Sequence, residues 1–239
     1  MERTRVAPVT GAELAIAAAA AATAGGLAWF SPRLVAALPE PEDAAEGKPR
    51  YTDLAVRRGL ALRLAVASAL AAGSVGVVLA DSAVLAPWVY VCAVGVVLAF
   101  IDWHTTLLPF RIVAPSYAVV AALVLLAGAL ERDRDLVVRA GVGWLASFTV
   151  FFLMWLVYSK GLGYGDVRLS GVLGMALAAV GWQELVVGMY AAFLFGAVGG
   201  GVLALLRKVD RRAYPFGPFM VLGACFGVVS GPLFAWSTG

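Results

Sequence analysis

Two aspartates are the residues of this sequence best suited to do chemistry, because each lies at the edge of a long apolar run. Asp102 follows the stretch "VVLAFI", and Asp166 stands in "GLGYGDVRLS", just ahead of another apolar run. Ionisable side chains at membrane depth are costly unless they are paired or hydrated, so they are candidates for function. Two neighbouring carboxylates can share a proton and activate a water molecule between them. The pair therefore predicts a chemical role for these two acids.

Each aspartate also has a simpler interpretation. An aspartate just before a helix is a favoured N-cap, which would account for Asp166, and Asp102 could merely mark the membrane interface. The two acids together favour the chemical interpretation. Gly163 and Gly165, beside Asp166, would allow positive φ angles and a close approach of the backbone. Helix dipoles predict Asp166, at a helix start, as the base and Asp102, at a helix end, as the neutral acid.

The elements that must position these acids are membrane helices. Of the 239 residues, 62% are hydrophobic and 14% are charged, and the mean hydropathy is +0.90. A bilayer core of about 30 Å needs about 20 apolar residues in a helix. The chain is therefore predicted to be an all-α, polytopic integral membrane protein with about eight transmembrane helices. The apolar runs lie at 12–30, 60–80, 84–101, 112–130, 137–158, 169–182, 184–206 and 217–236.

Two of these runs need a closer look. The Ala-rich run at 12–30 follows Arg3 and Arg5, as the apolar core of a signal peptide would, but it lacks a clear cleavage site. Its small residues suit close helix packing, so we expect a membrane helix there. The run at 169–182 is short and ends at Gly181 and Trp182, where it borders the next run.

Lysine and arginine predict the orientation of the chain, because positively charged loops stay on the cytoplasmic side of the membrane. The loops at 31–59, 102–111, 159–168 and 207–216, with their edges, hold 13 of the 18 basic residues. These loops should be cytoplasmic and both termini external, which puts the two aspartates at the same, cytoplasmic face. The net charge of +3 is spread over the membrane flanks, so membrane lipid rather than nucleic acid is the expected partner.

No metal site is expected in this chain. It holds two cysteines, Cys92 and Cys225, both inside apolar runs, and a single histidine, His104. Structural zinc sites need several such ligands. We expect the cysteines to be packing residues and the histidine to be a polar group at the interface.

Three segments together resemble the prepilin peptidases, which are membrane aspartyl proteases with a Gly-x-Gly-Asp motif. They are "IDWHTTLLP", "GLGYGDVRL" and "YPFGPFMVLG", the last at the start of the final apolar run. The likeness covers about residues 60–239. It implies a membrane-embedded aspartyl peptidase domain at 60–239, preceded by an N-terminal transmembrane helix and a cytoplasmic loop at 1–59.

The resemblance implies that Asp102 and Asp166 are the catalytic pair, with Gly163, Gly165 and Arg168 in the active-site loop. It also implies an aspartic endopeptidase that removes the leader peptides of type IV prepilins or prepilin-like proteins, in type IV pilus assembly or protein secretion. The implied location is the bacterial inner membrane, with the active site at the cytoplasmic face.

The chain departs from the usual family pattern in several places. Relatives usually have a lysine where Arg168 stands, and Leu-Pro-Asp where this chain continues from Leu108 and Pro109 to Phe110. Many relatives carry a cytoplasmic four-cysteine zinc module and methylate the new pilin N-terminus with S-adenosylmethionine. This chain lacks those cysteines, so N-methyltransferase activity stays open. No cofactor is expected, except S-adenosylmethionine if methylation is retained.

The first loop is acidic, with five acidic and two basic residues between positions 39 and 53. The implied substrates have a short basic leader before a long apolar helix, so this loop could hold the leader through weak, exposed charge pairs. A solvated linker with incidental charge explains the loop equally well. The candidate substrate-binding residues are Glu40, Glu42, Asp43 and Glu46.

Two other classes of protein fit the pattern less well. An ion- or proton-coupled membrane transporter could use the same two aspartates as a relay. Inverted repeats are common in transporters, but none is evident in this sequence. A structural scaffold of an export machine would leave the pairing of the aspartates unexplained.

Overall fold

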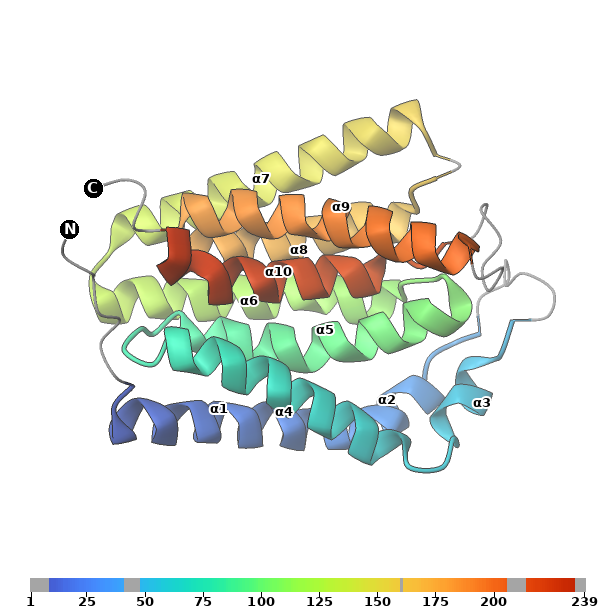
Figure 1. Cartoon of the computed structure of the whole chain (residues 1–239), viewed down its shortest axis with the longest axis horizontal. Helices are drawn as coiled ribbons and strands as arrows, with labels where there is room; N and C mark the ends of the chain where they lie inside the picture. Colours follow the sequence, from blue (N-terminus) through green and yellow to red (C-terminus); the bar gives the residue numbers. More distant parts are fainter. Residues whose placement is uncertain (1–8, 41–47, 160, 206–213, 235–239) are drawn as a thin grey trace.

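The computed structural model describes residues 9–40, 48–159, 161–205 and 214–234, and across these residues the chain is all-α, as predicted. Figure 1 labels the helices in chain order. They are α1 (Gly11–Trp29), α2 (Ser31–Ala36), α3 (Tyr51–Ala55), α4 (Leu60–Val78), α5 (Leu85–Thr105), α6 (Phe110–Glu131), α7 (Arg134–Val157), α8 (Tyr164–Val180), α9 (Trp182–Leu205) and α10 (Gly217–Phe234).

The long helices α1 and α4 to α10 coincide with the eight predicted apolar runs. Among the described residues, six helices are long and apolar enough to cross a membrane, the first of them running on from α1 into α2. Helix α8 has 17 residues, and the apolar part of α10, Gly217–Gly231, is also short. The prediction of an all-α, polytopic membrane protein is confirmed, while the number of eight spans stays a prediction.

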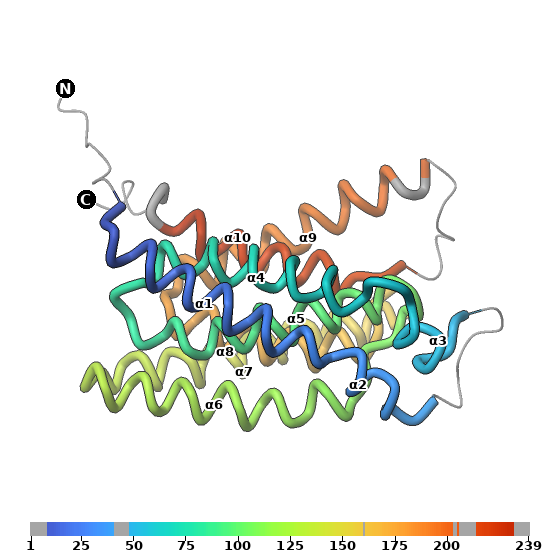
Figure 2. The backbone as a smooth tube through the Cα atoms, turned by 90° about the horizontal axis from the view of Figure 1, so that it is seen from below, coloured from blue at the N-terminus to red at the C-terminus, as the bar shows by residue number. Residues whose placement is uncertain are grey.

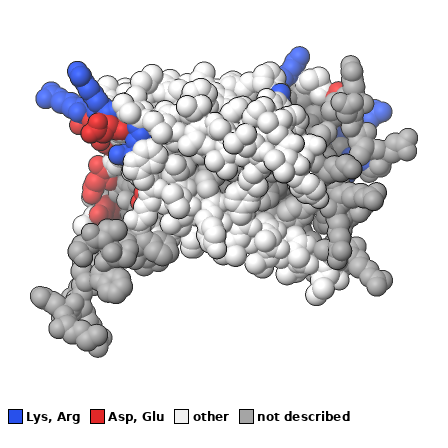
Figure 3. Space-filling model, turned by 90° about the horizontal axis from the view of Figure 1, so that it is seen from above, with Lys and Arg blue, Asp and Glu red and all other residues white. Residues whose placement is uncertain are grey.

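The connections between helices are sorted to the two ends of the bundle. In Figure 1, α2, α3 and the α5–α6 and α7–α8 connections lie at the right, which we call the site end, while α1 begins and α10 ends at the left. This is the grouping that the basic residues predict, although most of the loop at 207–216 lies outside the described residues. On the face shown in Figure 3, charged side chains gather at the two ends and leave a broad uncharged band between them.

Helix α8 lies at the centre of the bundle. It packs against α5, α6, α7, α9 and α10, and 13 of its 17 residues are buried. A Cβ added to Gly143 of α7 would lie 2.9 Å from the carbonyl oxygen of Gly174, so glycines allow α7 and α8 to approach closely, as is usual between membrane helices. Helix α8 begins at Tyr164, well before the predicted start at 169, so Asp166 lies within its first turn.

The C-terminal end of α8 is held by an arginine of α7. Arg139 donates hydrogen bonds from Nε to the carbonyl oxygen of Ala178, at 2.6 Å, and from Nη2 to that of Ala179, at 2.9 Å. The last carbonyl groups of a helix have no partner within the helix, and a positive charge there also suits the helix dipole. Arg139 therefore stabilises the end of α8 that lies away from the site end.

Small residues also bring the first helix into the bundle. Helix α1 packs along α4 and touches α5. A Cβ added to Gly76 of α4 would lie 2.9 Å from the Cα of Ala17. This is the close packing that the Ala-rich run at 12–30 predicts. The proposed division of the chain at 59/60 stays a prediction.

Candidate active site

Asp102 lies in the last turn of α5, with only 4% of its surface exposed. Its Oδ2 accepts a hydrogen bond of 2.8 Å from the backbone N–H of Gly217, the first residue of α10. A Cβ added to Gly217 would stand 2.9 Å from that oxygen. Because a side chain at this position would push the carboxylate away, the glycine allows a backbone donor to reach Asp102.

Gly217 is a site residue to which the sequence assigned no role, although its segment is one of the three that resemble the prepilin peptidases. The available signal was the pair Gly217-Pro218 at the start of the last apolar run. A glycine lets the backbone approach another group, and a proline suits the start of a helix. Asp102 and Gly217 are 115 residues apart in the sequence, so only the fold brings them together.

Asp166 is the third residue of α8, and 7% of its surface is exposed. The N-cap of this helix is Gly163, whose N–H donates a hydrogen bond of 3.0 Å to Oδ2 of Asp166. An acidic residue takes this position in a capping box. The interpretation of Asp166 as the N-cap is therefore wrong, although its carboxylate does stabilise the start of α8.

The glycines of the Gly-x-Gly-Asp motif matter because, without a side chain, they let neighbouring groups come close to the backbone. Gly163 has a φ of −75°, and Gly59 is the only glycine with positive φ among the described residues, so the expected positive φ angles at Gly163 and Gly165 are wrong. A Cβ added to Gly165 would lie 2.8 Å from the Cβ of Leu108 in the α5–α6 connection. The absence of a side chain at Gly165 thus lets the start of α8 pack against the segment that follows Asp102.

The fold brings the two aspartates to the same end of the bundle. Helix α5 contacts α8, α10 contacts both, and the negative charge of Asp102 acts on Asp166. Within the described part of the chain, each carboxylate accepts one hydrogen bond, from Gly217 or from Gly163. A carboxylate has room for about four acceptor contacts. Both groups therefore keep oxygen lone pairs free for water or a substrate.

Helix dipoles do not separate the roles of the two acids. Asp166 sits in the first turn of α8, as expected. Asp102 closes α5 but also faces the N-terminus of α10 through its bond from Gly217. Since each carboxylate meets the positive end of a helix, the prediction of Asp102 as the acid and Asp166 as the base loses its basis.

Arg168 lies between two aromatic rings at the start of α8. Its guanidinium carbon is 4.6 Å from the ring centroid of Phe110 and 4.5 Å from that of Tyr164, which are cation–π distances. Its carbonyl oxygen accepts a hydrogen bond from the hydroxyl of Tyr117. These contacts fasten the start of α8 to α6, so Arg168 is placed to position the motif.

One of the predicted substrate-binding residues in the first loop, Glu40, has a structural role. The carboxylate of Glu40 accepts hydrogen bonds from the backbone N–H groups of Tyr51, at 3.0 Å, and Thr52, at 3.1 Å, and so caps α3. Burial raises the pKa of Glu40, but these bonds and one from the Thr52 hydroxyl together lower it below its ordinary value. Glu42, Asp43 and Glu46 lie outside the described residues.

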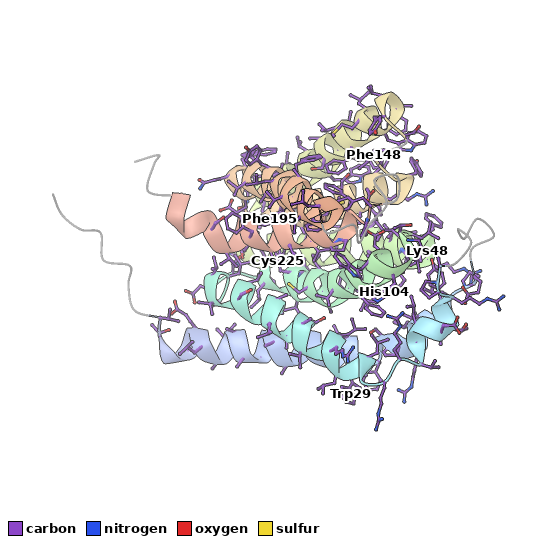
Figure 4. All side chains as sticks on the ribbon, turned by 45° about the vertical axis from the view of Figure 1, so that its right-hand side comes forward. Trp29, Lys48, His104, Phe148, Phe195 and Cys225 are labelled. Carbon is purple, nitrogen blue, oxygen red and sulfur yellow. The ribbon has the colours of Figure 1, made fainter. Side chains whose placement is uncertain are left out.

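A cavity of about 350 Å³ lies between this loop and the end of α5. Its polar wall includes Lys48 and Arg50, and the positive charge of Lys48 acts on Asp102. Figure 4 labels Lys48 at this end of the bundle. Among the described residues, the one acid in the wall is Glu40, whose oxygens already accept bonds from α3. The full lining is Glu40, Lys48, Pro49, Arg50, Tyr51, Thr105 and Leu107.

Possible metal ligands are not grouped near the aspartates. Within the described ranges, no three side chains of His, Cys, Asp or Glu come together to hold a metal ion. His104 bonds through Nδ1 to the carbonyl oxygen of Phe100, at 2.8 Å, and packs on the Phe100 ring. The expectation of a site without metal stays a prediction.

The fold and the site define a polytopic helical membrane protein with a buried pair of aspartates at one end of the bundle. Residues 89–203, which include both aspartates, match the model of the type IV leader peptidase family. The resemblance seen in the sequence is confirmed.

Curated relatives agree with this assignment. The chain is 32% identical over 152 residues to a prepilin leader peptidase/N-methyltransferase of Aeromonas salmonicida, covering 63% of this chain and 49% of the relative. It is 35% identical over 136 residues to the protein of that name from Pseudomonas putida, covering 56% and 46%. For the protein of that name from Escherichia coli K12, the values are 32% over 139 residues, 57% and 59%. The chain thus spans about half the length of these relatives. No solved structure shows significant similarity to it.

Proposed function

We propose that this chain is a membrane aspartic endopeptidase that cleaves the leader peptides of type IV prepilins or prepilin-like proteins, with Asp102 and Asp166 as its acid–base pair. The observation that carries the proposal is the placement of the two aspartates. They come from different helices and are buried at one end of the bundle. Among the described residues, each accepts a hydrogen bond from one glycine N–H. The names of the relatives support the substrate class, and the family match gives no support to a transporter.

The proposed mechanism is hydrolysis without a covalent intermediate. One carboxylate, ionised, takes a proton from a water molecule as that water attacks the scissile carbonyl carbon. The other, protonated, gives its proton to the carbonyl oxygen, which forms a tetrahedral diol. The first carboxylic acid then gives the proton it took from water to the leaving amide nitrogen, the C–N bond breaks, and the second carboxylate takes back a proton from the diol. Because the two groups are coupled, their protonation states belong to the pair rather than to either residue. Burial in an apolar bundle strengthens these interactions by excluding competing water.

The proposed location is the bacterial inner membrane, with the site end at the cytoplasmic face. The distribution of lysine and arginine supports this orientation, because the basic loops at 31–59, 102–111 and 159–168 belong to the site end. The proposed partners are prepilin precursors and membrane lipid. The proposed site uses no metal and no cofactor, and S-adenosylmethionine would be needed only for methylation.

The test is co-expression of the full chain with a tagged type IV prepilin precursor, followed by mass spectrometry of the product N-terminus. We expect a shortened product that lacks the leader. A methyl group on the new N-terminus would show that methylation is retained. A precursor that stays full length beside the intact chain, but is shortened by one of the curated relatives, would contradict the proposed function.

A further inference from the structure

A long apolar groove runs along one side of the bundle between α1 and α6. Two cavities form it, one of about 600 Å³ in the half away from the site end and one of about 430 Å³ at the site end. Both are lined by Leu27 and Tyr90, so they are continuous. Figure 2 shows α1 and α6 as the two flanks, with α5 between them.

The lining of the groove indicates what can fill it. Most of the lining side chains are apolar. The hydroxyl groups among them, on Thr23, Ser31, Ser82 and Tyr90, are already hydrogen-bonded within the protein. Among the described residues, the one charged side chain in the lining is Arg111, which lies at the site end. An occupant must therefore be apolar along its length and can carry a polar or negative group only near the site end.

A helix fits this shape better than a lipid tail. The groove extends from Leu130, at the end of α6 away from the site, to Leu38, at the end of α2. It therefore covers the depth of a whole bilayer, which one apolar helix of about 20 residues spans and one acyl chain does not. On the α1 side the wall includes Ala19 and Ala20, and small residues allow a second helix backbone to come close.

The groove ends beside the candidate active site. Leu38 lines its last part and Glu40, two residues further along, lines the cavity next to Asp102. In the same way, Arg111 lines the groove and Leu107 lines the cavity. A peptide that leaves the groove at the site end would thus come to the cavity at the end of α5, the helix that carries Asp102.

We propose that this groove holds the apolar membrane helix of the substrate, and that the residues preceding this helix extend from the site end of the groove towards Asp102 and Asp166. The inference rests on the proposed function, because it is the substrate's scissile bond that must reach the two aspartates. It names the face of the bundle through which the substrate is recognised, and it makes α1 and α6 part of the binding surface.

Two adjacent leucines of α6 give a matched test. Leu126 lines the groove and Leu125 does not, and their exposed fractions are similar, at 52% and 57%. A photo-crosslinking amino acid is placed at each position in the full chain carrying Asp102→Asn, in vesicles of phosphatidylethanolamine and phosphatidylglycerol with a tagged type IV prepilin precursor. We expect the crosslink to the apolar segment of the precursor to be several times stronger from Leu126. Ala19 and Ala18 of α1 give a second pair, since only Ala19 lines the groove.

Equal yields within both pairs would overturn the proposal. So would crosslinks from Leu126 that reach only lipid or a second copy of this chain. A steady-state assay with the otherwise native chain adds a measurement: Leu126→Trp should raise KM about tenfold by filling the groove, and Leu125→Trp should leave it unchanged. If the native chain cleaves the precursor but the crosslinks show no preference for Leu126 or Ala19, the groove proposal alone is refuted. If the crosslinks show that preference but the native chain does not cleave the precursor, the proposed function is refuted and the groove proposal stands.

Discussion

An ionisable side chain lies at each end of α8, Arg139 of α7 at one end and Asp166 of α8 itself at the other, but the two side chains are bonded very differently. At one end Arg139 donates to three successive carbonyl groups, those of Ala178, Ala179 and Val180. At the other end Asp166 accepts one hydrogen bond from the described part of the chain, that of the Gly163 N–H. The arginine is occupied in closing the helix, while the carboxylate keeps most of its acceptor capacity. A charged group inside the bundle therefore does not by itself indicate a catalytic role. Such a role is indicated when the group still has hydrogen-bonding positions that the protein does not fill.

The largest effect should follow from removing the acids at the site end. We expect Asp102→Asn and Asp166→Asn each to lower the rate of precursor cleavage by about 10²–10⁴-fold or more, with normal accumulation of the protein. Asparagine keeps the oxygen that accepts the glycine N–H but cannot take up a proton. Asp81→Asn, at an exposed aspartate, is the control. Near-normal processing by either site variant, measured by mass spectrometry, would show that the carboxylate at that position does not take part in the reaction.

A smaller effect is expected from displacing Asp102 without removing it. In Gly217→Ala, the new Cβ would lie 2.9 Å from Oδ2 of Asp102, so the carboxylate must shift. A misplacement of about 1 Å can cost about 10²-fold in rate, and we expect a loss of kcat of that order. Gly141→Ala is the matched control, because nothing lies within 4 Å of its added Cβ. An unchanged kcat for Gly217→Ala would mean that the bond to α10 does not position Asp102.

At the other end of α8 the same kind of change should affect stability rather than chemistry. Arg139→Met leaves the last carbonyl groups of α8 without their donor, which should lower the free energy of unfolding by about 1–3 kcal/mol. The kcat of the folded protein should be retained. Denaturation in detergent, with Arg134→Met of the same helix as the exposed control, measures the difference. A loss of kcat at unchanged stability would show that Arg139 is needed for activity and would contradict the assignment of a purely structural role to this end of α8.

The smallest effect concerns Glu40, which lies at the site end but whose hydrogen bonds cap α3. Its pKa is lowered in the folded protein, so its contribution to stability is present above the ordinary pKa of glutamate, about 4.3, and is lost as the pH falls through the lowered value. We expect the hydrogen-exchange protection of the Tyr51 and Thr52 amides to fall below about pH 4. Glu40→Gln should remove this pH dependence. Protection that varies with pH equally in both proteins would exclude Glu40 as the cap of α3.

The sequence predicted the helices well and their junctions less well. Apolar runs of membrane length identify a helix wherever they occur, and the eight long helices follow them. The start of α8 was placed too late because Gly163, Tyr164 and Gly165 are not strong helix formers. They begin the helix because Gly163 caps it and Gly165 packs against Leu108.

The predicted site was incomplete for a related reason. Asp102 and Asp166 could be singled out because both border apolar runs at the same predicted face of the membrane. The bond between Asp102 and Gly217 joins residues 115 positions apart, and the bonds of Glu40 join it to a helix that begins at Tyr51. A local pattern shows which residue is polar but does not show which distant backbone group it meets.

The central claim is that Asp102 and Asp166 act as one catalytic unit, and a double-mutant cycle tests it most directly. Single-turnover cleavage rates are measured for the native chain, Asp102→Asn, Asp166→Asn and the double variant. Residues that act as a unit are strongly non-additive, so we expect the double variant to be no slower than the slower single variant, to within about threefold. A double variant whose loss of rate equals the product of the two single losses would show independent groups and contradict the account.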